Sequence, residues 1–200
     1  MLEPQQQTGL EAFLKKWGVQ VDDDLVVSPI LGMVNVTALG TDYAPHPVTA
    51  KLEGVNTSFP YARSIRRLAA AQGTDADQPR VTELVKTPAK AGFWGETEPD
   101  AQRVEFDPLR DLPGPLSLAV AVERGRAGSA GVELGITRAV VAGSSSFVDN
   151  STLSGGNLDF FMNSLNWLFQ REQLVAVGPK TPDEFRLDMT LQRSDRKSVV

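Results

Sequence analysis

The sequence predicts a chain of the α/β class: a layered domain with a partly parallel central sheet, helices packed on it, and a Pro/Gly-rich middle segment that contains strands. Three observations support this class. Residues 115–123, PLSLAVAVE, form a continuous apolar run, which is typical of a strand covered on both faces. Residues 139–169 follow the order apolar run, polar loop, helix, which is the order of an α/β unit. Residues 43–102 hold many Pro, Gly and turn residues between short apolar runs.

A short helix is predicted near the start of the chain. Thr8 and Glu11 have the spacing of a capping box, in which each side chain accepts a hydrogen bond from a free backbone N–H. Gly18 is placed to end the helix in a left-handed conformation. The apolar face of this helix comprises Leu10, Phe13, Leu14 and Trp17. Residues 22–24, three aspartates, are predicted to form a solvated turn, because consecutive carboxylates lack the alternate spacing of a calcium loop.

Strands, turns and loops are predicted over the rest of the chain from alternation, apolar runs and turn residues. The predicted strands cover residues 25–30, 33–39, 55–65, 81–87, 115–123, 139–142 and 173–180. One or two helical turns are predicted over residues 46–52, and loops are predicted over residues 72–79, 95–103 and 124–135. The sequence has no internal repeat and no sharp domain boundary. We therefore expect a single domain over residues 1–180 and a polar tail over residues 181–200.

The stretch GGNLDFFMNSLNWLF, residues 155–169, is predicted to be a helix with two apolar faces. Its wider stripe is expected to face the core, and it comprises Leu158, Phe161, Met162, Leu165, Leu168 and Phe169. Phe160 and Trp167 point the opposite way, and we expect either the Pro-rich middle segment or a partner subunit to cover them. Asp159, Asn163 and Asn166 form a narrow polar flank between the two faces. This flank is interpreted as a hydrogen-bonding seam to neighbouring loops, with a ligand site as the alternative.

The composition excludes several kinds of chemistry. The chain of 200 residues has no cysteine, which excludes disulfides, thiolate metal ligands and a cysteine nucleophile. Its net charge of −5 is spread along the chain without the concentrated basic surface that nucleic acids require, so we expect no nucleic-acid partner. A single histidine and scattered acids give no metal-ligand spacing, and no Gly-rich phosphate loop is present. We therefore expect neither a metal nor a cofactor.

Two candidate chemical sites remain in the sequence. His46 lies between two prolines, and it is interpreted as a turn-packing residue, with a catalytic role as the alternative. Ser144, Ser145 and Ser146 follow Gly143 in a loop that lies between a predicted strand and a helix, where free N–H groups can bind an anion. The alternative is that these serines satisfy the backbone of the turn. GSSSF does not match the G-x-S-x-G elbow of α/β-hydrolases, which weakens a hydrolase interpretation.

Several pieces of the sequence together resemble one family. In chain order they are GLEAFLKKWGV, DDDLVV, HPVT, FPYARSI, LVKTPAKAGFWGET, FDPLRDLPGPLSLAVAVE, RAVVAGSSSFVDN and GGNLDFFMNSLNWLFQREQLVAVGPK. They are similar to the extracytoplasmic domain of GldG-like gliding-motility proteins, which are auxiliary subunits of uncharacterised bacterial ABC-type transport systems. The resemblance runs from about residue 10 to about residue 180 and is specific through the order and number of the pieces.

The resemblance implies an α/β domain distantly similar to the amidotransferase-like domains of intraflagellar transport proteins. It also implies that strands of the full domain precede residue 1, and that membrane helices outside this chain flank the domain. The tail over residues 181–200 would then be membrane-proximal on the periplasmic side. The family's loop resembles G-D-S-D-F, whereas this chain has Ser144 and Ser146 at the acidic positions. The family implies no established catalytic residues, and amidotransferase chemistry requires a cysteine that the chain lacks.

The sequence therefore favours a non-enzymatic extracytoplasmic interaction domain of a bacterial ABC-type transport complex. Its expected partners are the permease and ATPase subunits on other chains, and Phe160 and Trp167 are candidate interface residues. A first alternative is a degenerate amidotransferase-like hydrolase that uses His46 and a serine of residues 144–146. A second alternative is a small-ligand or glycan-binding module that uses the serine loop and the polar flank.

Overall fold

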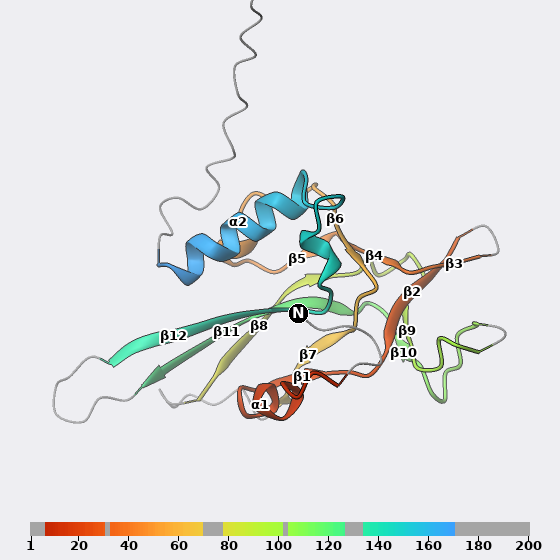
Figure 1. Ribbon diagram of the computed structural model, residues 1–200, viewed down its shortest axis with the longest axis horizontal. Helices are drawn as coiled ribbons and strands as arrows, with labels where there is room; N and C mark the ends of the chain where they lie inside the picture. The colour runs from red at the N-terminus through yellow and green to blue at the C-terminus, as the bar shows by residue number, and fades with distance from the viewer. Residues whose placement is uncertain (1–6, 31–32, 70–77, 102–103, 127–133, 171–200) are drawn as a thin grey trace, which may run out of the picture.

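The computed structural model describes residues 7–30, 33–69, 78–101, 104–126 and 134–170, and it contains both helices and strands (Figure 1). The helical elements are α1 (Glu11–Lys16), η1 (Pro47–Thr49), η3 (Ser146–Val148) and α2 (Gly156–Leu168). The strands in the first half are β1 (Val19–Val21), β2 (Leu25–Ile30), β3 (Met33–Asn35), β4 (Thr37–Gly40), β5 (Asp42–Tyr43), β6 (Thr57–Pro60) and β7 (Ile65–Arg67). The later strands are β8 (Arg80–Lys86), β9 (Trp94–Glu96), β10 (Leu112–Pro113), β11 (Ser117–Arg126) and β12 (Leu134–Ala142).

The described strands form small antiparallel sheets. Their orders are β12-β11-β8-β5, β10-β9-β2-β3, β1-β7 and β4-β6, and each strand pair among them is antiparallel. The expectation of a partly parallel sheet is therefore wrong for this part of the chain. A parallel pair needs a strand after the crossover helix. The strand predicted after α2, residues 173–180, lies outside the described residues.

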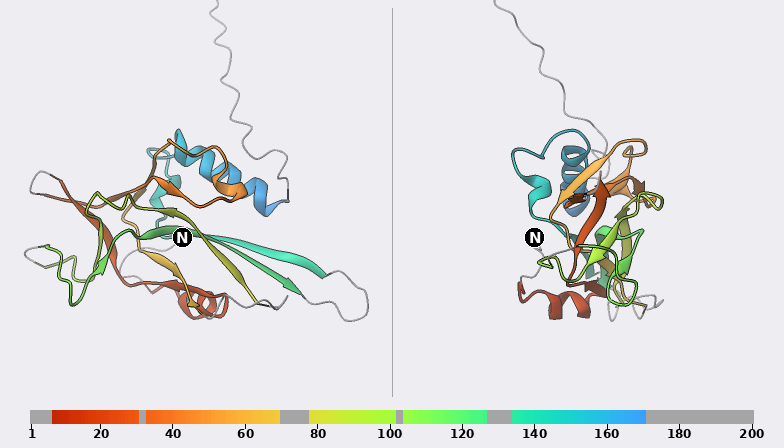
Figure 2. Two further views of the ribbon diagram at one scale, coloured as in Figure 1. Left: turned by 180° about the vertical axis from the view of Figure 1, so that it is seen from behind. Right: turned by 90° about the vertical axis from the view of Figure 1, so that its right-hand side faces the viewer.

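β11 is the centre of the molecule, and the prediction that this strand is covered on both faces is confirmed. Leu118 and Ala121 contribute to a cluster of buried side chains below α2, and Val120 and Val122 contribute to a second cluster on the other face. Figure 1 shows α2 above the long strands β8, β11 and β12, and α1 below them. The two views in Figure 2 keep this order of α2, long strands and α1.

The predicted first helix is present as α1. The Thr8 backbone N–H donates to Glu11 Oε1 at 3.0 Å, and Thr8 Oγ1 accepts from the Leu10 N–H at 3.3 Å. Gly18 ends the helix with φ of 75°, and its N–H donates to the Lys15 carbonyl at 3.0 Å. Gly18 therefore ends the helix as the sequence predicts, whereas the Thr8 and Glu11 hydrogen bonds lie just before the helix, whose N-cap is Leu10.

Two predicted strands are each divided in the structure. Residues 33–39 form β3 and β4, because the Asn35 side chain binds both the N–H and the carbonyl of Thr37 and turns the chain between them. The two halves then pair with different strands, β2 and β6. Residues 55–65 contain only β6 before a break at Tyr61, which has a φ of 52°. Alternation predicts extended backbone but does not show where a side chain redirects it.

The predicted loops begin and end at other residues than the loops of the structure. Residues 94–96 form β9, which pairs with both β2 and β10, although residues 95–103 are predicted to be a loop. β11 extends to residue 126 and β12 begins at residue 134, so both strands extend into the predicted 124–135 loop. Residues 127–133 and the tail over residues 181–200 lie outside the described residues. None of the described helices is long and apolar enough to cross a membrane.

The three consecutive aspartates do not form a solvated turn, because two of them are buried. Asp24 Oδ1 accepts from the Ser64 N–H, and Asp24 Oδ2 accepts from Ser64 Oγ, both at 2.7 Å. Asp22 binds Arg66 through both carboxylate oxygens, at 2.8 and 3.0 Å. Burial raises the pKa of Asp24 to about 6. These carboxylates therefore connect the segment before β2 to Ser64 and to β7.

Candidate functional site

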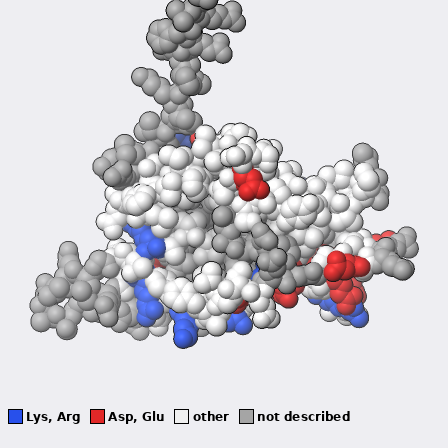
Figure 3. All heavy atoms as spheres, viewed as in Figure 1, with Lys and Arg blue, Asp and Glu red and all other residues white. Residues whose placement is uncertain are grey.

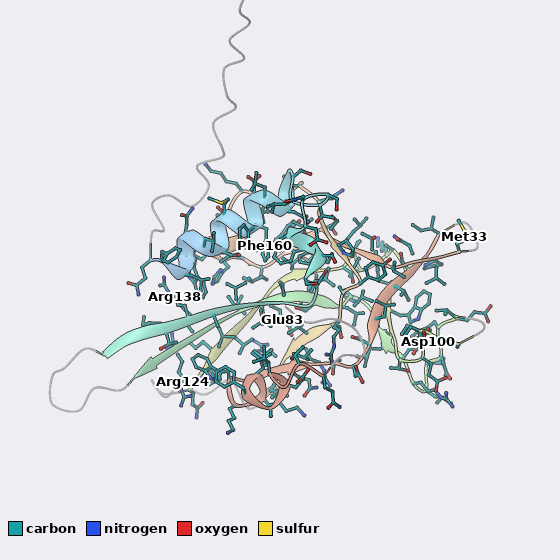
Figure 4. The ribbon with its side chains drawn as sticks, in the orientation of Figure 1. Met33, Glu83, Asp100, Arg124, Arg138 and Phe160 are labelled. Atoms are coloured by element: carbon teal, nitrogen blue, oxygen red, sulfur yellow. The ribbon has the colours of Figure 1, made fainter. Side chains whose placement is uncertain are left out.

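Helix α2 packs on the core with the face opposite to the one predicted. Phe160 and Trp167 are 0% and 2% exposed, whereas Met162 on the wider stripe is 43% exposed. The Phe160 ring lies 6.1 Å from Phe59 and 5.9 Å from Phe147, between the helix and the strands (Figure 4). The two aromatic residues are thus core residues and not an exposed interface. Part of the expected cover is present, because η1 and β6 of the Pro-rich middle segment pack on α2.

The buried face of α2 includes polar side chains, and each of them has a backbone partner. Asn157 Oδ1 accepts from the Ser58 N–H at 2.8 Å, and Asn157 Nδ2 donates to the carbonyls of Ser58 and Phe147, both at 2.9 Å. Ser164 Oγ donates to the Phe160 carbonyl at 2.8 Å within the helix. A buried polar group with its hydrogen bonds made costs little, so this mixed face can pack against the core.

Within the predicted polar flank, Asn163 makes the expected hydrogen bond to a neighbouring segment. Asn163 is buried and its Nδ2 donates to the Ala50 carbonyl at 3.3 Å, which ties α2 to the residue after η1. Asp159 and Asn166 are half-buried. Gly156 allows the close approach at the other end of the helix, because a Cβ there would overlap the Asn56 carbonyl oxygen. The helix therefore contacts the middle segment at both of its ends.

His46 has a packing role beside Trp167, as its position between prolines predicts. Its Nδ1 accepts from the Val48 N–H at 3.1 Å at the start of η1, and its ring stands edge-on to Trp167 at 4.9 Å. Arg138 lies over the same indole at 4.9 Å and donates to the Trp167 carbonyl at 2.8 Å. Burial lowers the pKa of His46, with Glu123 raising it and Arg138 lowering it further. The Trp167 ring is therefore in contact with both His46 and Arg138.

The hydrogen bonds of the serine loop connect it to other parts of the chain. Ser144 is buried, and its Oγ donates to the Pro60 carbonyl. Ser146 begins η3, and its carbonyl accepts from Thr152 Oγ1. The loop leads into η3, while α2 starts later at residue 156, so the three serines do not precede the α2 N-terminus directly. These contacts favour the interpretation of the loop as a structural turn over an anion site.

The pair required by the hydrolase alternative is not brought together. His46 contacts Trp167 near the end of α2, whereas Phe147, next to Ser146, contacts Asn157 near its start. Ten residues of helix separate these two contacts, which is about 15 Å along the helix axis. Among the described residues, no group of three His, Asp or Glu side chains is placed to hold a metal ion.

A hollow of about 550 Å³ lies at the other end of the molecule, and the sequence did not indicate it. Its walls come from the β2–β3 hairpin, β9, residues 104–106 and the end of β10. The side chains around it are mostly apolar or aromatic: Pro29, Met33, Val34, Phe93, Trp94, Val104, Phe106 and Pro113, with Glu105 as the one ionisable residue of this lining. A volume of this size and an apolar lining are typical of sites that accept a ligand or an anchoring side chain.

The back wall of the hollow is held in place by hydrogen bonds. The Trp94 indole N–H donates to Glu96 Oε2 at 3.1 Å, and Glu96 Oε1 accepts from the Glu98 N–H at 2.9 Å. Asp111 accepts from the Thr97 N–H at 3.1 Å and from the Asp107 N–H at 2.8 Å, which joins the two sides of the 97–111 loop. These contacts give the hollow a shape that is formed before any partner arrives.

The rim of the hollow exposes large apolar side chains. Met33 is 70% exposed, and Val34 and Phe106 are also exposed. Figure 4 shows Met33 at the same end of the molecule as Asp100, away from Phe160 and Arg138. Phe93, Trp94 and Phe106 are three aromatic residues within a Pro/Gly-rich segment, and this was the signal in the sequence that could have indicated the site. Contiguous exposed apolar surface marks interaction sites more often than isolated apolar residues do.

Comparisons with protein-family models, with curated proteins and with solved structures find no match to this chain. The candidate site therefore depends on the geometry of this structure alone.

Proposed function

We propose that this chain is a non-enzymatic interaction domain, and that the hollow between β2–β3 and β9 receives apolar side chains of a partner protein. The resemblance to GldG-like proteins supports a periplasmic domain of a bacterial ABC-type transport complex, with permease and ATPase subunits as partners. In this proposal the layered scaffold holds the hollow in a fixed shape, and contacts between proteins carry the function.

The apolar rim of the hollow is the observation that carries this proposal. Met33 and Phe106 are large side chains on two different segments, and both are exposed beside an apolar concave surface. Removing apolar surface from water stabilises a complex by about 25 cal/mol per Å², so binding of a partner that covers these residues is favourable. Interfaces of this kind concentrate their binding energy in a few aromatic and apolar anchors near the centre.

The residues that the other functional hypotheses require serve the fold instead. Ser144 Oγ donates to the Pro60 carbonyl, Asn163 Nδ2 donates to the Ala50 carbonyl, and His46 packs on Trp167. The geometry therefore favours the interaction domain over the hydrolase and over a glycan module built on the serine loop and polar flank.

The test is co-purification of the full-length protein with its membrane subunits from native cells. Met33→Ser should reduce the recovered permease and ATPase strongly, because it removes an apolar anchor at the rim of the hollow. Met162→Ser is the matched control, since Met162 is also exposed but lies on α2. Equal recovery with both variants and with the unmodified protein would refute docking through the hollow.

A further inference from the structure

Acidic residues outnumber basic residues in the segment that contributes most of the residues beside the hollow. Residues 94–115 contain six acidic residues and two arginines, which gives them a net charge of −4, while the whole chain has −5. The rest of the chain is therefore close to neutral, at −1. A surface charge acts over about 10 Å at ordinary ionic strength, so these acids act at the rim together with Lys90, which precedes the lining residue Gly92 by two positions.

The acidic residues of this segment have two different roles. Glu96 and Asp111 are buried and hold the loop through hydrogen bonds. Glu98 and Asp100 are exposed on the 97–111 loop, and Glu105 lines the hollow. Glu98 pairs with Arg110 at 2.5 Å, so this arginine offsets an acid within the segment. The charge that faces an approaching partner is therefore negative.

The distribution of charge on the surface agrees with this. Figure 3 shows most of the acidic side chains of this face at the right-hand end, where β9 and β10 lie in Figure 1, and most Lys and Arg side chains at the lower left. The molecule thus has an acidic end that also carries the apolar hollow. A partner segment that is both apolar and basic complements both properties.

We propose that the hollow binds a segment of the partner protein in which apolar side chains are flanked by Lys or Arg. This inference rests on the proposed function, because it specifies the partner that docks at the same hollow. The apolar side chains enter the hollow, and the flanking cations lie beside Asp100 and Glu105. Complementary charge at a rim increases the association rate and selects among partners that share the same apolar anchor.

The experiment uses three synthetic peptides that share one apolar core of Phe, Met and Leu. The core is flanked at both ends by lysines, by glutamates or by serines, and fluorescence anisotropy measures binding of each labelled peptide to the whole chain. At low salt the lysine peptide should bind about tenfold more tightly than the glutamate peptide, and the difference should shrink at about 300 mM salt.

Variants that remove charge test whether Asp100 and Glu105 cause the preference for the lysine peptide. Asp100→Asn with Glu105→Gln should weaken the lysine peptide about threefold or more and leave the serine peptide unchanged. The matched control is Glu53→Gln with Asp149→Asn, which removes the same charge from exposed positions outside the hollow lining. If both pairs weaken binding equally, the peptide responds only to net charge, and the inference is overturned.

The outcomes separate this inference from the proposed function. Equal binding of the three peptides, with loss of binding in Met33→Ser, overturns the charge preference and leaves apolar docking in the hollow supported. Binding that is indifferent to Met33→Ser, or no binding by any peptide, overturns both. Preference for the lysine peptide that requires both Met33 and the pair Asp100 and Glu105 supports both.

Discussion

Two tryptophans, Trp167 and Trp94, lie in two regions that use aromatic side chains differently. Trp167 closes the core below α2, with His46 against one part of its ring and Arg138 over its face. Trp94 is almost as deeply buried, but it forms a wall of the hollow and has the exposed Phe106 at 6.4 Å. The difference shows that polar and charged neighbours surround the Trp167 ring, whereas the apolar walls of the hollow are left uncovered by the residues that the structure describes.

The largest effect is expected when the two tryptophans are truncated in turn. Trp167→Ala should lower the free energy of unfolding by about 3–5 kcal/mol, because it leaves a cavity in a closed core. Trp94→Ala should cost about half as much, since the space it vacates joins a hollow that already exists. Urea unfolding followed by circular dichroism measures both. Equal losses of unfolding free energy in the two variants would contradict the distinction between the closed core at Trp167 and the open hollow at Trp94.

A pH-dependent effect is expected from Asp24, whose carboxylate supports the strand that carries Trp94. A Cβ at Gly95 would overlap this carboxylate, which shows how closely the two segments pack. Burial raises the pKa of Asp24 from 3.8 to about 6. Between these pH values the folded state binds more protons than the unfolded state, so this group lowers stability as pH rises through the window.

The variant Asp24→Asn should remove this contribution, which is about 3 kcal/mol for a shift of about two pKa units. An amide keeps an acceptor for the Ser64 N–H and offers a donor to Ser64 Oγ, so the local contacts persist. Urea unfolding of both proteins at pH values from about 4 to about 7 measures the difference between their pH profiles. Parallel profiles would contradict a raised pKa at Asp24.

The hydrogen bonds of Asn157, which join α2 to β6, are expected to make an intermediate contribution to stability. Asn157→Ala should cost about 2 kcal/mol, because it leaves the Ser58 N–H and two carbonyls buried without their partner. Asn150→Ala is the control: Asn150 is exposed, and a change there should stay within about 0.5 kcal/mol. Thermal unfolding compares the two variants. If Asn150→Ala destabilises the chain as much as Asn157→Ala, the hydrogen bonds of Asn157 make no specific contribution to stability.

The smallest effect on stability is expected at the rim of the hollow. Met33→Ser should change the free energy of unfolding by less than about 0.5 kcal/mol, because the side chain is mostly exposed. The same variant should reduce docking, which sharpens the contrast with Trp167→Ala, where loss of folding comes first. If Met33→Ser destabilises the chain by more than about 2 kcal/mol, the rim belongs to the core and not to an interface.

Local signals in the sequence predicted local structure correctly. The hydrogen bond between Thr8 and Glu11, the left-handed Gly18 and the doubly covered strand 115–123 all depend on neighbours within a few residues or on a continuous apolar run. His46 was also interpreted correctly, because two adjacent prolines restrict its backbone. These features need no knowledge of distant contacts.

The orientation of α2 could not be predicted in the same way. Counting apolar residues favours the stripe with Met162 and Phe169, but Asn157 and Asn163 can be buried because Ser58 and Ala50, about 100 residues earlier, offer hydrogen-bond partners. The hollow was missed for a related reason. It is formed around β9, which pairs with β2 on one side and with β10 on the other, and no local pattern shows these pairings.

The position of α2 in the chain has a consequence for synthesis. Phe160 and Trp167 come later than every other buried member of the cluster that they close. During synthesis on the ribosome, the apolar face of β8, β11 and β12 that α2 covers must therefore remain exposed to solvent until residue 167 has emerged. Chaperones that bind nascent apolar segments have their longest opportunity on this surface, and a stalled chain ending near residue 150 should remain bound to them.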